Sequence, residues 1–230
     1  MEYLEFERIL SAKRMQRYKD AANGDTRKAM ALYRYNLRLS QEMFTIVSCF
    51  EVALRNAIDS LLAPTLGENW LKDSVQDNGI FSNGRMNETR KIIEKAYNRL
   101  NRQGIYSHSK LIAEMEFGVW KYMYSSLQYR ATGQCLLRAF PNKPRSSAAI
   151  QYNNTYIFNE LDKVNSLRNR IAHHEPICFR LHASEIDTSY IVNEYQKIQT
   201  LFSWMGIDSR SMLYGLDHVQ SVCSKINALK

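Results

Sequence analysis

Residues 32–61, LYRYNLRLSQEMFTIVSCFEVALRNAIDSL, form a long stretch with the periodicity of a helix. Apolar side chains recur along it every three, four or seven residues: Leu32, Leu39, Met43, Val47, Phe50, Leu54, Ala57 and Leu61. This spacing predicts an α-helix with one apolar face, on which Asn36 is the only polar residue. Ser40 offers an alternative helix start inside the stretch, whereas Pro64 and Gly67 end it.

The rest of the chain has the same character. Only nine glycines and four prolines interrupt 230 residues, and no segment shows sustained alternation of apolar and polar residues. We therefore predict an all-α fold. The length fits one domain over residues 1–230, with residues 1–25 and 64–87 as peripheral decorations and a helix over about 148–174.

Composition restricts the class of protein. The hydrophobic fraction of 45% and the charged fraction of 23% are typical of a globular chain. The net charge of +8 suits nucleic acid, an anionic membrane surface or an acidic partner. The four cysteines are far apart and form no metal-binding spacing, so we predict neither metal nor cofactor. No apolar run approaches the ~20 residues of a membrane span, and the first residues lack a signal-peptide core, which predicts a cytoplasmic protein without a membrane partner.

Residues 168–176, RNRIAHHEP, contain the most informative polar cluster. Ile157, Leu161 and Val164 precede it at helical spacing, and the same step leads to Arg168. This places Arg168 on the apolar stripe of its own helix. Because arginine keeps its charge, an inward-facing arginine must be paired, hydrated or used. The structural alternatives are an internal salt bridge, to Glu51 or Asp162, and snorkelling of the side chain at a helix end.

The same run adds hydrogen-bonding and titratable groups. His173 lies five residues after Arg168, near the predicted helix end, and Asn169 and His174 are its polar neighbours. Pro176 disfavours helix at the preceding residue and marks the stop. A fixed cation and an imidazole about a turn and a half apart suit phosphate chemistry.

Two family resemblances rest on these residues. Arg168-Asn169, followed after three residues by His173, resembles the signature of HEPN-domain proteins. The wider string over 166–177 resembles the C-terminal signature of the Abi family of bacterial phage-defence proteins. Two early segments, 33–40 and 50–56, resemble the N-terminal half of that family, so the likeness reaches from about residue 30 to 180.

The resemblance implies a HEPN-like helical bundle, with long antiparallel helices and peripheral short ones, that pairs as a homodimer. The motif helices would meet at the dimer interface and cleave single-stranded RNA without a metal. By the same resemblance, His173 acts as general acid or base, Arg168 holds the phosphate, and Asn169 orients the phosphate or the histidine. His174 satisfies a looser form of the spacing and is the alternative to His173.

The expected site extends beyond those three residues, since His174, Glu175 and Arg170 would support it. Arg99 and Arg102 belong to a basic face of a helix over about 87–102 and would contact RNA, although a solvated helix surface is the alternative. The implied function is an endoribonuclease in phage defence or a toxin–antitoxin system, with a cognate antitoxin or regulator as partner. Alternatives are a catalytically inactive helical module that binds RNA or a protein partner, and a purely structural oligomer.

Overall fold

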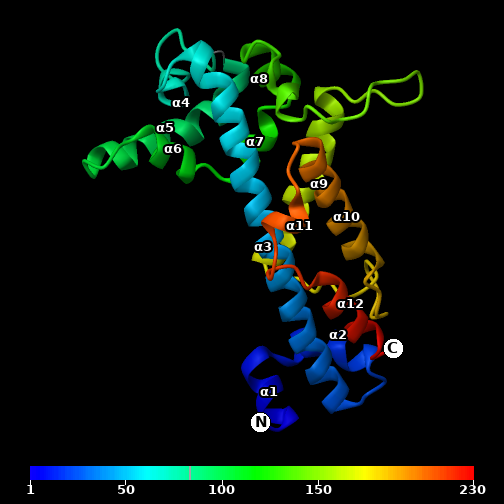
Figure 1. Cartoon of the computed structure of the whole chain (residues 1–230). Coiled ribbons are helices and arrows are strands. Elements are labelled where there is room, and N and C mark those ends of the chain that lie inside the picture. Colours follow the sequence, from blue (N-terminus) through cyan, green and yellow to red (C-terminus); the bar gives the residue numbers. More distant parts are fainter. Residues whose placement is uncertain (83) are drawn as a thin grey trace. The chain divides into compact units, whose positions relative to one another are not determined.

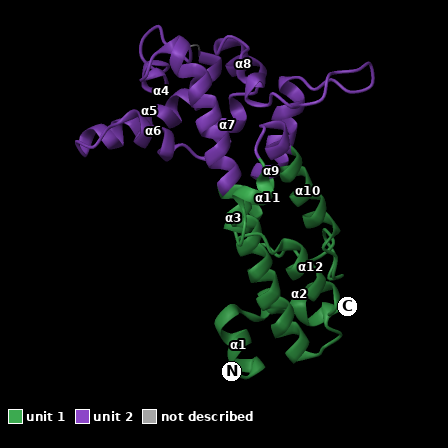
Figure 2. Cartoon of the chain, in the orientation of Figure 1, with its two compact units in different colours: residues 1–48, 166–200, 208–230 green, residues 49–165, 201–207 purple. Residues whose placement is uncertain are grey.

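Helices provide nearly all of the regular structure. The computed structural model describes residues 1–82 and 84–230 (Figure 1). Within these residues, the only β-type pairing is an isolated bridge between Phe179 and Ile186. The prediction of an all-α fold is confirmed. Contacts group the chain into two compact units (Figure 2): unit 1 comprises residues 1–48, 166–200 and 208–230, and unit 2 comprises residues 49–165 and 201–207.

The long predicted helix is the single helix α3 (Thr26–Leu66), and Ser40 does not start a second one. Most of the predicted stripe is fully buried: Leu32, Leu39, Met43, Val47, Phe50 and Leu54. In the last turns, Ile58 and Leu62 are buried instead of Ala57 and Leu61. A helix of 3.6 residues per turn drifts against any fixed three-and-four spacing, so the buried line moves to the neighbouring residue.

Unit 1 contains the predicted motif. Its helices are α1 (Tyr3–Leu10), α2 (Ala12–Ala21), the first part of α3, the last part of α9 (Asn154–Ala172), most of α10 (Ser189–Trp204), α11 (Ser209–Met212) and α12 (Val219–Asn227). The Tyr18 ring of α2 lies 5.2 Å from the Tyr33 ring and 5.1 Å from the Phe179 ring, measured between centroids. The N-terminal helices therefore contribute aromatic rings to the core of this unit.

Asn36, the polar residue on the apolar face of α3, has a structural role. Its side chain is buried, and its Oδ1 atom accepts a hydrogen bond from the backbone N–H of Ile177 at 2.8 Å. Ile177 is fully buried and directly follows Pro176. Asn36 thus fixes the chain at the point where it leaves the RNRIAHHEP run.

Replacing this amide should destabilise the fold. Asn36→Leu leaves the Ile177 N–H buried without an acceptor, which costs about 1–3 kcal/mol. Urea unfolding measures this loss, with Gln41→Leu as an exposed control on the same helix that should change stability by less than about 0.5 kcal/mol. Equal stability of Asn36→Leu and the wild type would contradict the anchoring role.

Unit 2 is built on the second part of α3. Its other elements are α4 (Trp70–Asp73), η1 (Gly84–Met86), α5 (Asn87–Arg102), α6 (His108–Glu114), α7 (Phe117–Tyr122), α8 (Ser126–Ala131), η2 (Leu136–Ala139) and the first part of α9. Its core contains the buried rings of Phe50, Trp70, Phe117, Trp120 and Phe202. Residues 64–87, expected as a decoration, supply Trp70 to this core.

The motif helix is shorter than predicted, because α9 begins at Asn154 and not near residue 148. The Oδ1 atom of Asn153 accepts the backbone N–H of Tyr156 at 3.0 Å, which caps the helix start. Upstream, the hydroxyl oxygens of Ser146 and Ser147 accept the N–H groups of Tyr152 and Ile150 and hold a loop. Local side-chain bonds of this kind compete with helix formation.

In the part of the chain that the structure describes, no helix combines the length and the apolar character that a bilayer crossing requires. The end of α9, which carries the RNRIAHHEP run, lies in unit 1 and is the candidate functional site.

Candidate functional site at the end of helix α9

The last turn of α9 closes in a defined C-cap. His174 has a φ of 55°, its N–H donates to the Ile171 carbonyl at 3.0 Å, and the Glu175 N–H donates to the Arg170 carbonyl at 2.9 Å. These two bonds form a Schellman motif with His174 in the left-handed position. Histidine adopts this conformation more readily than most residues. The backbone of His174 thus forms the C-cap that ends the helix.

Arg168 lies on the stripe of α9 at the predicted position, four residues after Val164 and three before Ile171, and its side chain is partly exposed. Its neighbour Leu167 is fully buried at the edge of the same face. After Val164, both the third and the fourth residue fall near the apolar face, and the leucine packs there. Asp162, one of the two alternative partners, pairs with Lys121 at 2.7 Å.

Arg170 is used by the fold. Its Nε atom donates to Glu175 at 3.2 Å, its Nη2 atom donates to the Pro176 carbonyl at 3.0 Å, and its guanidinium lies 5.0 Å from the centre of the Tyr190 ring. The interaction with Glu175 is also an ion pair. Arg170 and Glu175 therefore hold the chain as it turns away from α9, through two of the five guanidinium donors and an ion pair with the carboxylate.

The remaining polar residues of the run are free for a ligand. Asn169 and His173 are exposed and four residues apart, which places them on one face of the helix end. In the part of the chain that the structure describes, the side chains of Arg168, Asn169 and His173 make no hydrogen bond or ion pair. The His174 side chain is also exposed.

The segment after the motif carries a thiol that cannot act as a nucleophile. Cys178 is fully buried beside Ile177 and Phe179. Burial raises the pKa of the Cys178 thiol to about 12, because a thiolate loses its hydration in an apolar environment. The thiol is therefore protonated near neutral pH and contributes to packing.

Metal chemistry has no ligand cluster in the described residues. Across 1–82 and 84–230, no group of three or more His, Cys, Asp or Glu side chains is placed to hold an ion. The chemically available groups at this helix end are a guanidinium, an amide and imidazoles. These groups can bind a phosphate, orient it and move a proton.

Sequence reasoning missed a further cation at this helix end. Arg14, on α2, donates from Nη1 to the carbonyl of His174 at 2.9 Å. Arg17, one turn later, donates to the carbonyls of Ala183 and Arg180. The sequence contains no local signal for these contacts, since about 160 residues separate each arginine from its acceptor.

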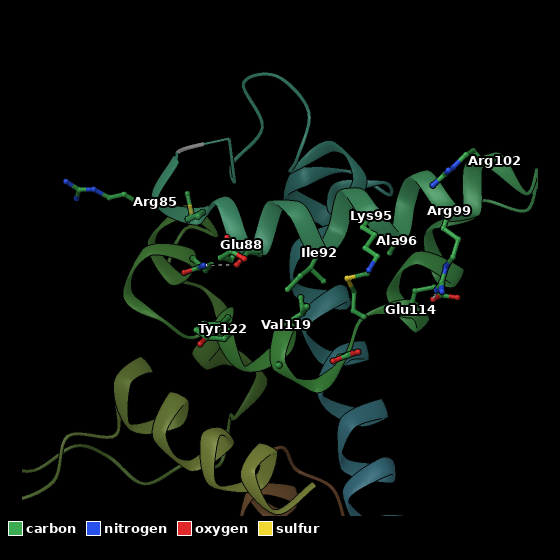
Figure 3. Close-up of a pocket in the computed structure, with 16 residues that line it drawn as sticks. Arg85, Glu88, Ile92, Lys95, Ala96, Arg99, Arg102, Glu114, Val119 and Tyr122 are labelled. Atoms are coloured by element: carbon green, nitrogen blue, oxygen red, sulfur yellow. Dashed lines mark hydrogen bonds and ion pairs between the residues drawn. The ribbon is translucent and has the colours of Figure 1, made fainter. Parts of the chain in front are cut away.

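A groove in unit 2 contains the two residues predicted to bind RNA. It has a volume of about 710 Å³ and lies between α5, α6 and α7 (Figure 3). Its lining includes Ile92 and Tyr122, which are 47% and 48% exposed, together with Lys95, Arg99 and Arg102. The groove thus combines apolar surface with basic side chains.

Part of the predicted basic face is neutralised. Arg99 forms an ion pair with Glu114, and Arg102 donates from Nε to the Asn98 carbonyl at 3.2 Å. On the same helix, Arg90 pairs with Glu94 at 2.7 Å. RNA binding by Arg99 and Arg102 stays a prediction, and the internal pairing reduces the charge that they can offer to a phosphate.

Comparison with known proteins identifies the family. A family model described as Abi-like protein matches residues 2–178. This match covers both early segments and the motif run through Cys178. Searches against curated proteins and against solved structures gave no match. Because the family model spans well over half of the chain, this chain belongs to the Abi-like protein family.

Proposed function

We propose that the chain is a metal-independent endoribonuclease that acts in phage defence and cleaves single-stranded RNA at a site built on Arg168, Asn169 and His173. Membership of the Abi-like family supports the role in abortive infection. The RNA chemistry rests on the side chains at the end of α9.

One observation carries this proposal. Between residues 168 and 175, the fold uses Arg170 and Glu175 and leaves the side chains of Arg168, Asn169 and His173 without a polar partner in the described part of the chain. The unoccupied residues are the three that match the Arg-polar-x3-His pattern. A cation, an amide and an imidazole kept free at a rigid helix end are suited to a ligand rather than to folding.

The proposed roles follow from the chemistry of each side chain. The Arg168 guanidinium binds the scissile phosphate and stabilises the charge that develops on its oxygens. His173 removes the proton from the ribose 2′-hydroxyl or delivers one to the departing 5′-oxygen. The Asn169 amide orients the phosphate or the imidazole. Attack of the 2′-oxygen forms a 2′,3′-cyclic phosphate and breaks the bond to the 5′-oxygen, so no water and no metal-bound nucleophile is needed.

The assembly is also part of the proposal. We propose that two copies of the chain pair through the ends of their α9 helices, so that two motifs share one RNA strand, and that a cognate antitoxin or regulator restrains cutting. The partial exposure of Arg168 on the apolar stripe supports this arrangement, because a partly exposed cation beside apolar surface is compatible with an interface.

A cleavage assay tests the proposed activity. Purified protein, incubated with generic single-stranded RNA and excess EDTA, should shorten the RNA, because none of the proposed roles requires a metal. Gel analysis of labelled RNA measures the cutting, and light scattering on the same sample measures the oligomeric state. Cutting that disappears with EDTA and returns with Mg²⁺ would contradict the proposal.

The unit 2 groove favours a second candidate function, an inactive helical module that binds RNA or a protein partner. Ile92 and Tyr122 are about half exposed there, and Lys95 makes no ion pair among the described residues. Tight RNA binding without cleavage, weakened by Lys95→Gln, would favour this module over the nuclease. Absence of both binding and cleavage would point to a structural oligomer.

A further inference from the structure

We infer that Arg14 is an additional phosphate-binding residue of the site at the end of α9. It would contact an RNA phosphate next to the one that Arg168 binds. This inference rests on the proposed function, since it assigns a substrate contact to the same site. It concerns a residue of the N-terminal helices, which the RNRIAHHEP run does not include.

The position of Arg14 is fixed by the motif itself. Its Nη1 atom donates to the His174 carbonyl at 2.9 Å, so the guanidinium lies against the C-cap that follows His173. The helix C-terminus presents partly unsatisfied carbonyl groups, which attract and orient a cation. Arg14 is therefore held by the motif backbone at the end of the helix that carries His173.

Its other donors are available. Guanidinium carries five N–H donors, and the bond to His174 uses one of them. No carboxylate pairs with Arg14 among residues 1–82 and 84–230, and the side chain is exposed. No carboxylate thus compensates its charge. The guanidinium N–H groups that do not bond to His174 can bind two phosphate oxygens.

The neighbouring arginines differ in this respect. Arg17 uses Nε and Nη2 on the carbonyls of Ala183 and Arg180, and its guanidinium lies 4.7 Å from the centre of the Phe179 ring. Arg180 pairs with Glu185 at 2.6 Å and with Asp187 at 3.7 Å. Arg17 and Arg180 therefore form contacts within the fold, to residues of the 174–188 segment. Arg14, like Arg168, has guanidinium N–H groups that are available to a ligand.

Binding of an uncleavable RNA tests this role separately from catalysis. The probe is a short fluorescent single-stranded RNA with a 2′-O-methyl group on every ribose, and anisotropy at several salt concentrations gives the dissociation constant. Arg14→Gln should weaken binding about tenfold, because one charged hydrogen-bonding contact is lost. It should also reduce the slope of log K against log salt by about 0.7, the contribution of one single-strand phosphate.

Two control variants separate substrate contact from a structural role. Arg14→Lys keeps the charge and should retain the salt slope of the wild type. Lys13→Gln removes an exposed charge from the same helix and should leave affinity and slope unchanged. A lower melting temperature of Arg14→Gln with an unchanged salt slope would overturn the inference and leave Arg14 as a C-cap only.

The cleavage assay distinguishes the two proposals. If the wild type cuts RNA and Arg14→Gln cuts and binds equally well, the inference fails and the nuclease assignment stands. If the wild type binds without cutting and Arg14→Gln binds more weakly, the nuclease assignment fails and the phosphate contact stands. A wild-type protein that neither binds nor cuts single-stranded RNA overturns both.

Discussion

His173→Ala should lower the rate of RNA cleavage in EDTA by about 10²–10⁴-fold, the usual contribution of a general acid or base. The side chain is exposed and makes no polar contact within the described residues, so its removal should leave the folded structure intact. The expected result is therefore a folded protein that binds RNA and does not cut it. Single-turnover kinetics on labelled RNA measure the rate, and circular dichroism checks the fold.

His174 provides the matched control. His174→Asn removes the adjacent imidazole but keeps a residue that tolerates the positive φ of 55° at the C-cap. This variant should cut within a few-fold of the wild type. The opposite pattern, with activity retained in His173→Ala and lost in His174→Asn, would transfer the proton-transfer role to His174. Full activity in both variants would show that neither imidazole transfers a proton in the reaction.

Arg168→Gln should reduce cleavage by about 10²–10³-fold, the effect of removing one group that stabilises transition-state charge. Because Arg168 makes no ion pair or hydrogen bond in the described residues, stability should change by less than about 0.5 kcal/mol. Cleavage kinetics and urea unfolding measure the two effects on the same preparation. Light scattering shows whether the substitution also changes pairing.

Arg170→Gln, two residues away, should give the reverse result. This substitution removes the bonds to Glu175 and to the Pro176 carbonyl and the contact with the Tyr190 ring. We expect a loss of about 1–2 kcal/mol in stability, with cleavage by the folded fraction largely retained. If both arginine variants lose stability and neither loses activity once folded, Arg168 has no role in the chemistry.

Local sequence patterns accounted well for helices and less well for the packing of borderline residues. The stripe from Leu32 to Leu54 identified α3, because strict helical spacing leaves few alternatives to a buried face. The partial exposure of Arg168 could not be predicted, because Leu167 packs in the same turn and only tertiary packing decides how deeply each of two neighbours is buried. The start of α9 was missed because serine and asparagine side chains bond locally to the backbone.

Contacts between residues that are far apart in the sequence could not be predicted from local patterns. The motif predicts Arg168, Asn169 and His173 as site residues, but it does not indicate which of its charged side chains form contacts within the fold. Arg170 became a structural residue because Tyr190 and the Pro176 carbonyl lie beside it in space. Arg14 reaches the same helix end from α2, and no periodicity or spacing encodes that contact.

Analysis of the cleaved ends tests the central claim most directly. The substrate is one single-stranded oligonucleotide, prepared as RNA, as 2′-O-methyl RNA and as DNA, and incubated with the protein in EDTA. Our account predicts cutting of the RNA alone, with 2′,3′-cyclic phosphate and 5′-hydroxyl ends that mass spectrometry identifies. Cutting of the 2′-O-methyl or DNA strand, or products with 5′-phosphate ends, would contradict it.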